Sequence, residues 1–464
     1  MPRVIIIGAG LAGSLLSIYL ARRGFSVDVF EARPDMRKSE IAAGRSINLA
    51  LSDRGIAALR EVGMDEYMLA EAVPMFGRMI HSPSGETKLL PYSGRKGEYI
   101  NSVSRAGLNI ALMNEAEKYA NVQFIFNQRC IGFNPDIGEV RFENGRTIRG
   151  DTVVATDGAG SAVRHSMQQS VLGFQSTEVF LEHGYKELHI PPGPTDEFLL
   201  DKNALHIWPR QRFMMIALPN FDGSFTCTLF LTSKSSPHYE GGVTADSADG
   251  VVLSEPSFEN LTDSQSVSAF FNREFPDAVP LMPTLVEDFF HNPTGHLGTM
   301  KCWPWNVDGK ALLLGDSAHA MVPFYGQGMN CAFEDVRVLD SLIDKHGDDW
   351  PTVFEEYGKL RKGNTDAIQD MAEENFYEMR DATADPVFQR KRELETKLEQ
   401  TYPDYFSKYS MVTFREDVPY SFAKRKGNAQ DELLMNICSN VCSTDELNLD
   451  DVMSQVKQLE STTL

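Results

Sequence analysis

Residues 4–31 carry the pattern that most constrains the fold of this chain, a glycine-rich turn between two apolar segments. The β-branched run 4–7 leads directly into Gly8-Ala9-Gly10-Leu11-Ala12-Gly13. Residues 14–23 show the apolar spacing of a helix, and a second strand is predicted at 27–30, closed by Glu31. A GxGxxG turn in this strand–helix–strand context typically binds a dinucleotide, because the helix N-terminus faces the pyrophosphate and the distal acid accepts hydrogen bonds from a ribose. We therefore predict an α/β fold with a Rossmann-like nucleotide domain.

A second segment, Gly315 to Asn330, is expected to hold the rest of this ligand. The apolar run 311–314 ends at Gly315-Asp316, a turn with two glycines follows at 323–328, and helical spacing continues from 329 to 344. An ordinary strand–loop–helix unit is the alternative. The N-terminal motif does not distinguish FAD from NAD. Because the chain has no second GxGxxG and no CxxC pair of the disulfide-reductase kind, one dedicated dinucleotide site is predicted.

Charge and cysteine content exclude several classes of partner. Lys and Arg number 44 against 65 Asp and Glu, which gives a net charge of −21, so neither nucleic acid nor an anionic membrane surface is expected as the main partner. The six cysteines form no CxxC spacing, and we expect free thiols, no metal site and a cytoplasmic location. No run of about 18 apolar residues occurs, and residues 436–464 are polar and acidic, so no transmembrane anchor is expected. No pattern in the sequence specifies an oligomeric state.

The middle of the chain contains a third candidate site. An apolar strand, 152–156, ends in Asp157-Gly158, and Ser161 and Arg164 follow at the start of a predicted helix. A type I turn with a helix cap by Ser161 would explain this pattern without a ligand. Arg105, after another strand-like segment, is a second charged residue directed at the same core, with a solvated helix N-terminus as its alternative.

Apolar alternation in two parts of the chain predicts an antiparallel sheet inserted in the nucleotide domain. Residues 76–91 read as two strands joined by a turn, and three more strands are predicted at 204–208, 213–218 and 224–231. Residues 233–263 are rich in Ser, Asp and Gly and are expected to form a surface connection. Charged helical patterns over 375–402 and 431–459 predict an α-helical C-terminal region.

Three motifs occur in order along the chain: GAGLAG with Glu31, ATDGAGSAVR at 155–164 and LLLGDSAHAMVPFYGQGMN at 312–330. This arrangement resembles the single-component, FAD-dependent aromatic hydroxylases of the para-hydroxybenzoate hydroxylase type. Further segments look like those of the kynurenine 3-monooxygenase family, and the resemblance extends from Arg3 to about Val412. These segments are 44–52, 76–81, 204–209, 323–335 and 409–414.

The resemblance implies a flavoprotein monooxygenase that uses bound FAD, NADPH as a transient co-substrate and O2. It would hydroxylate L-kynurenine at C3 to 3-hydroxykynurenine through a flavin C4a-hydroperoxide, a step of tryptophan degradation and NAD biosynthesis. A hydroxylase of another aromatic ring and an FAD-linked amino-acid oxidase are alternative enzymes, and a flavin-bearing redox sensor that binds a protein partner is an alternative from another class. No segment indicates where NADPH docks.

We expect three regions in the chain. A discontinuous FAD-binding domain would comprise 1–73, 98–180 and 288–370, and an antiparallel β-sheet substrate domain would comprise 74–97 and 181–287. The C-terminal helical region would be 371–464.

Carried over residue by residue, the resemblance implies two sets of site residues. The FAD-binding set is Gly8, Gly10, Leu11, Ala12, Gly13, Glu31, Arg33, Ala50, Arg105, Cys130, Asp157, Asp316, Gly328, Met329 and Asn330. The substrate-binding set is Arg78, Tyr92, Asn375, Tyr409, Leu205, Met214, Ile216, Leu218, Phe230, Pro323, Phe324 and Met379. Within these sets, Cys130 would touch the adenine side through its backbone only. Arg78 and Tyr92 would bind the amino-acid carboxylate, and Asn375 would assist.

The implied chemistry requires little acid–base catalysis from the protein. The ring amine of kynurenine already donates electrons to the position that is hydroxylated, so the flavin would do the chemistry. Tyr325, at a position where relatives carry His or Phe, and His319 are the candidates for a catalytic side chain. For His319, a packed histidine that hydrogen-bonds the backbone is the preferred alternative.

Two local patterns support specific roles. Arg78 shares its strand parity with Phe76 and Ile80, so we predict that it is buried with a partner rather than solvated at a sheet edge. A helix that begins near Gly328 would stabilise negative charge on reduced flavin by up to ~1–2 kcal/mol.

Overall fold

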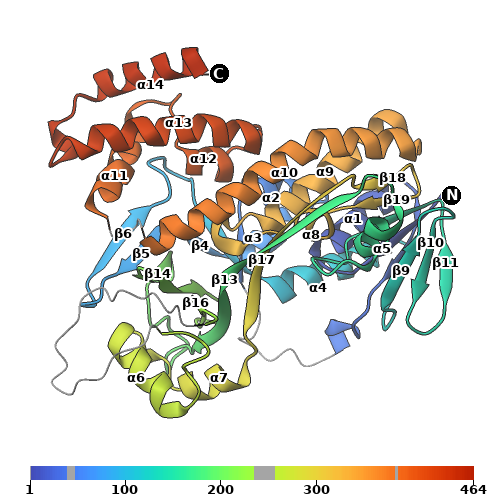
Figure 1. Cartoon of the computed structure of the whole chain (residues 1–464), viewed down its shortest axis with the longest axis horizontal. Helices are drawn as coiled ribbons and strands as arrows, with labels where there is room; N and C mark the ends of the chain where they lie inside the picture. Colours follow the sequence, from blue (N-terminus) through green and yellow to red (C-terminus); the bar gives the residue numbers. More distant parts are fainter. Residues whose placement is uncertain (1, 39–47, 235–255, 382–384, 464) are drawn as a thin grey trace.

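The computed structural model describes residues 2–38, 48–234, 256–381 and 385–463 (Figure 1). Parts of three predicted segments lie outside the described residues: 44–47 of the motif 44–52, 235–255 of the connection 233–263, and 382–384 of the helical segment 375–402.

A six-stranded sheet forms the nucleotide part of the chain, with strand order β18-β19-β12-β1-β2-β8. β1 pairs in parallel with both β2 and β12, and the edge strand β18 is antiparallel to β19. Residues 4–6 of β1 are completely buried, as expected for a central parallel strand covered on both faces. The strands are β1 Arg3–Ile7, β2 Ser26–Phe30, β8 Val122–Ile125, β12 Thr152–Ala155, β18 Asn306–Val307 and β19 Ala311–Leu313.

Helices pack on this sheet, and three of them begin within the predicted motifs: α1, α5 and α9. Helix α1 contacts both α4 and α9, and α9 contacts α2. The predicted start of the first helix, at residue 14, is three residues too late, because Gly10 in an extended conformation is the N-cap and the helix begins at Leu11. The helices are α1 Leu11–Arg22, α2 Asp53–Glu61, α3 Asp65–Ala70, α4 Arg105–Ala116, α5 Ala162–Ser170, α8 Asp316–His319 and α9 Gly328–His346.

A second, seven-stranded sheet has the order β17-β13-β16-β15-β14-β5-β6. It confirms the predicted hairpin and the three predicted strands, and it adds β13 and β17, which were not predicted. The first half of β13 is largely exposed, so it lacks the apolar alternation that reveals a strand. The strands are β5 Gly77–His81, β6 Thr87–Pro91, β13 Gln175–Ile190, β14 Ala204–Arg210, β15 Phe213–Pro219, β16 Phe225–Thr232 and β17 Gly295–Trp303.

Apolar residues of two helices and one face of this sheet form a separate core. The helices are α6 Ser264–Glu274 and α7 Leu285–His291, and the core includes Trp208, Phe271 and Phe289. Two three-stranded sheets complete the β structure, in the orders β3-β7-β4 and β11-β10-β9. Their strands are β3 Asn48–Leu51, β4 Val73–Met75, β7 Ile100–Ser104, β9 Cys130–Asn134, β10 Glu139–Phe142 and β11 Thr147–Arg149.

The C-terminal part of the chain is helical, as predicted, and α11 to α14 lie together at the upper left of Figure 1. The single helix predicted over 431–459 is wrong, because a capping box of Ser443 and Glu446 starts a separate turn between α13 and α14. Two of the domain boundaries that we predict from the sequence, after residues 180 and 370, fall inside continuous elements. Residue 180 lies within β13, and residue 370 lies within α10. The helices are α10 Trp350–Asp381, α11 Pro386–Thr401, α12 Lys408–Thr413, α13 Tyr420–Ser439 and α14 Leu449–Thr463. None of the helices in the described ranges is both long and apolar enough for a membrane span.

Candidate active site

The GxGxxG turn packs against β12 and leaves one side open. A Cβ at Gly13 would lie 2.1 Å from the Gly8 carbonyl oxygen, and a Cβ at Gly8, where φ is +102°, would lie 2.5 Å from the Thr156 carbonyl oxygen. These two glycines are therefore required for packing. A Cβ at Gly10 would meet no described atom within 4 Å, which fits a turn whose open side receives a ligand.

Glu31 closes this turn from the end of β2. Its carboxylate accepts hydrogen bonds from the Ala9 N–H at 2.9 Å and from the Arg33 N–H and Nε. Burial raises the pKa of Glu31, but the hydrogen bonds from Arg33 and Ala9 outweigh it, so its pKa is lowered overall. Glu31 is thus a buried, ionised acceptor held at the turn, suited to a ribose hydroxyl.

Asp157 offers an unused acceptor beside the same strand ends. Its Oδ2 accepts from the Ala162 N–H at 2.9 Å, whereas its Oδ1 is buried without a hydrogen-bond partner among the described residues. Burial raises the pKa of this carboxyl. Ser161 also caps α5 by accepting from the Arg164 N–H, so the predicted helix cap is confirmed. An orphaned buried oxygen beside an open glycine turn fits a bound dinucleotide.

Arg164, which sequence reasoning noted but did not place in the site, connects the second and third motifs. Its guanidinium is almost completely buried and donates to the carbonyl of Ser317 at 3.0 Å and to the carbonyl of Ala159. The spacing S-x-x-R was the available signal. Asp316, the first residue of α8, and Arg105, the first residue of α4, are both exposed.

The turn before α9 is braced by the side chain of Asn330. Its Nδ2 donates to the carbonyls of Ala50 and Gly326, and its Oδ1 accepts from the Ser52 N–H at 3.0 Å. Gly326 has φ +68°, a conformation that favours glycine. The Asn330 side chain is therefore used within the protein and holds the turn in place.

Cys130 stands at the start of β9, and its thiol donates to the Gly132 carbonyl. Burial, followed by the nearby Asp157, raises the pKa of the Cys130 thiol to about 12, so the thiol is neutral.

The structure brings Arg78, Asn375, Tyr409 and Tyr325 together around one small cavity. The cavity volume is about 10 Å³, roughly the space of one water molecule. Arg78 lies on β5, Asn375 on α10, Tyr409 on α12 and Tyr325 before α9, so four distant segments meet here. The other lining residues are charged: Glu378, Lys391, Arg392, Glu395 and Lys408.

Arg78 is buried with a partner, as predicted. Its Nη1 lies 3.4 Å from Glu378 Oε1, and its Nε is buried without a hydrogen-bond partner among the described residues. Burial lowers the pKa of Arg78, but Tyr409 and Glu378 raise it more, so the side chain is a cation. Because the contact with Glu378 is long and uses one nitrogen, the guanidinium of Arg78 retains N–H donors for a carboxylate ligand.

Three tyrosines line up beside Arg78. The Tyr92 ring stacks on Tyr409 with centroids 5.1 Å apart, and Tyr409 stacks on Tyr325 at 5.6 Å. The guanidinium carbon of Arg78 lies 5.2 Å from the Tyr409 ring centroid and 5.9 Å from that of Tyr92. Burial raises the pKa of Tyr325 well above its usual value, so its hydroxyl is neutral.

Most of the predicted apolar wall is also brought together. One buried cluster contains Met214, Phe230, Phe324 and Met379, with Leu205, Ile216 and Tyr409 packed against it. Leu205 and Tyr409 also pack against a neighbouring cluster that contains Tyr92, as does Leu218. Pro323 is exposed and belongs to neither cluster. A larger hollow of about 520 Å³ between α6 and α7 is lined by none of the predicted site residues.

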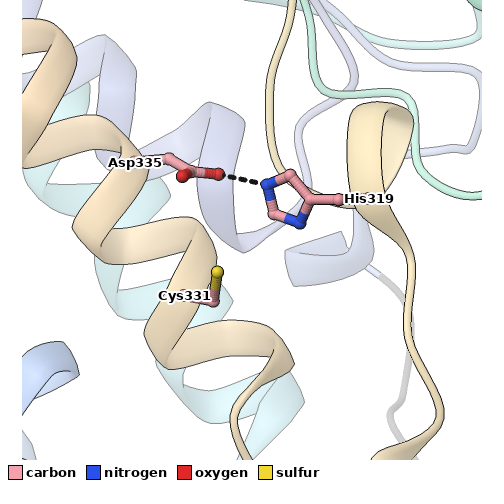
Figure 2. A group of neighbouring side chains, drawn as sticks. All are labelled: His319, Cys331 and Asp335. Carbon is pink, nitrogen blue, oxygen red and sulfur yellow. Dashed lines mark hydrogen bonds and ion pairs between the residues drawn. The ribbon is translucent and has the colours of Figure 1, made fainter. Parts of the chain in front are cut away.

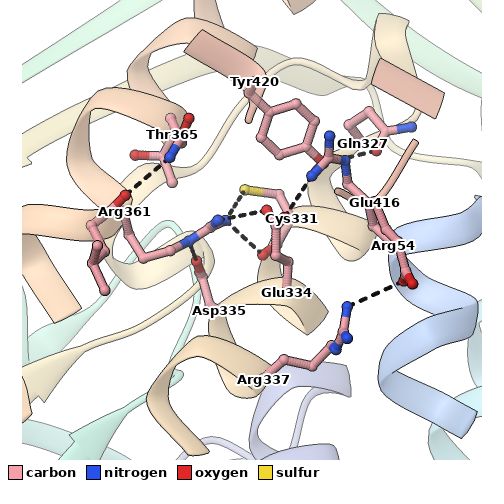
Figure 3. Close-up of polar contacts among 12 residues, drawn as sticks. Arg54, Gln327, Cys331, Glu334, Asp335, Arg337, Arg361, Thr365, Glu416 and Tyr420 are labelled. Carbon is pink, nitrogen blue, oxygen red and sulfur yellow. Dashed lines mark hydrogen bonds and ion pairs between the residues drawn. The ribbon is translucent and has the colours of Figure 1, made fainter. Parts of the chain in front are cut away.

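His319 does not face the pocket. Its Nε2 lies 2.6 Å from Asp335 Oδ2 and hydrogen-bonds it (Figure 2). The prediction that His319 is packed inside the protein is confirmed. The prediction that its partner is a backbone group is wrong, because the partner is a carboxylate. Asp335 also accepts from the Gly315 N–H and from Arg361 Nε at 2.7 Å. The spacing of three side chains would allow them to surround a metal ion: His319, Cys331 and Asp335. However, the Asp335 carboxylate is already paired with the Arg361 guanidinium, a cation that takes the place a metal ion would have (Figure 3).

Comparisons with known proteins identify the family of this chain. A family model described as FAD binding domain matches residues 1–217 and 285–357. The chain is 46% identical over 457 residues to a kynurenine 3-monooxygenase of Myxococcus xanthus (strain DK1622), covering 96% of this chain and 93% of the relative. It is 42% identical over 464 aligned residues to a kynurenine 3-monooxygenase of Dictyostelium discoideum, covering 97% and 95%.

Solved structures show the fold alone, because their sequences are distant. A tetrameric form of 2-methyl-3-hydroxypyridine-5-carboxylic acid oxygenase matches with a TM-score of 0.63 at 20% identity, over 84% of this chain and 96% of that one. P. aeruginosa PqsL in complex with 2-aminobenzoylacetate matches with a TM-score of 0.62 at 17% identity, over 82% and 97%. Both support the predicted architecture of a Rossmann-like domain with an added antiparallel sheet.

Proposed function

Because this chain belongs to the kynurenine 3-monooxygenase family of FAD-binding proteins, we propose that it hydroxylates L-kynurenine at C3 to give 3-hydroxykynurenine. It is an FAD-dependent aromatic monooxygenase with NADPH and O2 as co-substrates. The observation that carries the choice of substrate is the convergence of Arg78, Asn375 and Tyr409 on one cavity beside Tyr325. The reaction would be a step of tryptophan degradation and NAD biosynthesis.

The FAD site would follow the three motifs. Gly8, Gly10 and Gly13 would admit the pyrophosphate to the N-terminus of α1, and Glu31 would accept from the adenosine ribose. The free Oδ1 of Asp157 would accept a hydrogen bond from the cofactor. Of the other predicted members, Leu11 and Ala12 begin α1, Arg105 begins α4 and residues 328–330 begin α9, where they would contact other parts of the cofactor. When bound, FAD supplies hydride acceptance from NADPH and activation of O2.

The protein's own contribution would begin with binding the amino-acid end of the substrate. Arg78 is a buried cation held by one contact of 3.4 Å to Glu378, and its planar fork can bind a carboxylate with two parallel hydrogen bonds. The Tyr92 hydroxyl is buried without a partner among the described residues, and Asn375 donates to the Phe324 carbonyl at 2.6 Å. Arg78 and Tyr92 would therefore hold the carboxylate, while Asn375 fixes the segment that carries Phe324 and Tyr325.

A second contribution would be the exclusion of water from the aromatic ring. The cluster around Phe230, Phe324 and Met379 is almost completely buried, so a ring placed against it would lie in a dry environment. His319 is engaged by Asp335, and Tyr325 is held neutral by burial. Neither side chain is therefore assigned the role of a general base, which agrees with a substrate whose ring amine provides the activation.

The rate at which purified, FAD-loaded protein consumes NADPH, measured with and without L-kynurenine, tests the proposal. Addition of L-kynurenine is expected to accelerate NADPH oxidation and to give one 3-hydroxykynurenine for each NADPH consumed. Formation of a keto acid without NADPH would favour the amino-acid oxidase. Acceleration by another aromatic compound alone would favour a hydroxylase of a different ring. No hydroxylated product from any aromatic amino acid would favour the redox sensor.

A cytoplasmic location is also proposed. The six cysteines are unpaired thiols, which is typical of proteins in a reducing compartment.

A further inference from the structure

The side-chain amide of Gln327, in the turn before α9, is engaged on both sides by other elements. Its Oε1 accepts from the Tyr420 hydroxyl at 3.0 Å, and its Nε2 donates to Ser52 Oγ at 3.3 Å. Gln327 is 2% exposed and is the N-cap residue of α9. The turn assigned to the flavin ring is therefore held by the N-terminal end of α2 on one side and by the first residue of α13 on the other.

The Tyr420 hydroxyl is the donor of the hydrogen bond to Gln327 Oε1. Its side chain is completely buried, and burial raises the pKa of its hydroxyl well above the usual value, so the proton stays on the oxygen. The Arg54 guanidinium lies 4.0 Å from the Tyr420 ring centroid and fixes the ring (Figure 3). Since a neutral phenol donates to Gln327 Oε1, the amide is left with its NH2 group directed to Ser52.

Arg54 connects this contact to the wall of the substrate pocket. Its Nε donates to the Val412 carbonyl at 3.1 Å, and its Nη2 donates to the carbonyls of Arg415 and Val418. Its Nη1 is paired with Glu334 at 2.5 Å. Tyr409, whose ring stacks on Tyr325, lies just before this segment on α12. One short segment, residues 409–420, thus has Tyr409 at the pocket and Tyr420 at the turn.

We propose that Tyr420 is a positioning residue for flavin reduction, acting through the Gln327 amide on the turn at Gly326–Gly328. The inference rests on the proposed function, because it takes that turn as the one that faces the flavin. By fixing Gln327, Tyr420 sets how the N-terminus of α9 is presented to a reduced flavin, which a helix N-terminus stabilises. The same segment carries Tyr409, so occupancy of the pocket is transmitted to the turn.

The variant Tyr420→Phe removes only the hydroxyl, and Tyr405→Phe is the matched control. Tyr405 lies in the same helical region, and its hydroxyl is buried without a partner among the described residues. In Tyr420→Phe, we expect the kynurenine-stimulated rate of flavin reduction to fall about fivefold to tenfold, the effect of one lost hydrogen bond. The flavin midpoint potential should become more negative, while the FAD dissociation constant and the KM for kynurenine stay within about twofold of the parent values. Tyr405→Phe should match the parent protein in all four.

A double-mutant cycle with Gln327→Met tests the route of the effect. Methionine keeps the length of the side chain and removes the amide, so the Tyr420→Phe effect on the midpoint potential should vanish in the Gln327→Met background. An undiminished effect in that background, or a potential in Tyr420→Phe equal to that of Tyr405→Phe, would overturn the inference. The midpoint potential requires no substrate. A parent protein that hydroxylates no kynurenine would therefore refute the proposed function, while the potentials still decide the role of Tyr420.

Discussion

The guanidinium of Arg78 lies 5.2 Å from the ring of Tyr409, although one residue belongs to the β5 strand and the other to the C-terminal helix α12. The proposed substrate pocket would therefore be built jointly by the seven-stranded sheet and the C-terminal helices. Neither part alone would surround an amino-acid ligand. In the proposed function, the C-terminal helices contribute directly to substrate binding.

Replacement of Arg78 should weaken substrate binding selectively. Arg78→Ala removes a charge-assisted, bidentate partner of the carboxylate, so the KM for L-kynurenine should rise by about 10- to 100-fold. The flavin spectrum and the FAD dissociation constant should not change, because Arg78 lies on β5 of the seven-stranded sheet, whereas the GxGxxG turn follows β1 of the other sheet. Steady-state kinetics and a flavin titration measure both.

Arg78→Lys is the matched control for charge. Lysine keeps the positive charge but cannot form two parallel hydrogen bonds, so its KM should lie between those of the parent and of Arg78→Ala. Equal KM values for all three proteins would show that the carboxylate is bound elsewhere.

Substitution by alanine should have different effects at two glycines of the first motif, on FAD affinity at one and on thermal stability at the other. A Cβ at Gly10 meets no described atom within 4 Å, whereas a Cβ at Gly13 would lie 2.1 Å from the Gly8 carbonyl oxygen. Gly10→Ala should therefore fold with normal thermal stability in the absence of FAD and lose FAD affinity at least tenfold, since its methyl group occupies the approach to the pyrophosphate. Gly13→Ala should lower the melting temperature of the protein without FAD. If Gly10→Ala bound FAD normally, the cofactor would lie elsewhere.

The nucleotide site and the general architecture were predictable because local patterns encode them. Glu31, Asp157 and Asp316 each follow a short apolar strand, and the six-stranded sheet brings these strand ends together by its parallel topology. The exposed half of β13 and the break between α13 and α14 were missed, because neither has the apolar periodicity that prediction uses. Tertiary contacts such as His319 with Asp335, or Tyr420 with Gln327, join distant segments and leave no local signal.

The Asp335 carboxylate should be a major source of stability. It is completely buried, and although burial raises its pKa, His319 and Arg361 lower it further, so it is ionised. Asp335→Asn leaves the buried Arg361 with Glu334 as its remaining acidic partner, and we expect a loss of about 3–5 kcal/mol in the free energy of unfolding. Urea unfolding measures the loss. Glu356→Gln removes a partly exposed partner of Lys345 and His346 and should change stability far less, because exposed ion pairs contribute little. Equal effects of the two substitutions would show that the buried Asp335 carboxylate has no special role in stability.

His206 should make the free energy of unfolding depend on pH. Burial lowers its pKa from 6.5 to about 4, while its Nδ1 contacts His81 Nε2 at 2.9 Å and its Nε2 contacts the Asp201 carbonyl. His81 in turn faces Asp277. Between pH 6.5 and pH 4 the unfolded chain binds a proton at His206 that the folded chain does not. The stability that neutral His206 contributes is therefore present above pH 6.5 and is lost as the pH falls to 4, by up to about 3 kcal/mol.

Unfolding titrations across this pH range check the prediction. His206→Gln should flatten the pH dependence between pH 6.5 and pH 4, and the exposed His165→Gln should leave it unchanged. A slope that survives in His206→Gln would assign the pH dependence to other groups.

The proposed function requires this chain to insert an oxygen atom from O2 into the aromatic ring of L-kynurenine. The mass of the product formed from L-kynurenine and NADPH under ¹⁸O2 tests this step. We expect 3-hydroxykynurenine that carries one ¹⁸O atom, in equal amount to the NADPH oxidised. Unlabelled product, or NADPH oxidation that yields hydrogen peroxide and unchanged kynurenine, would contradict the proposed function.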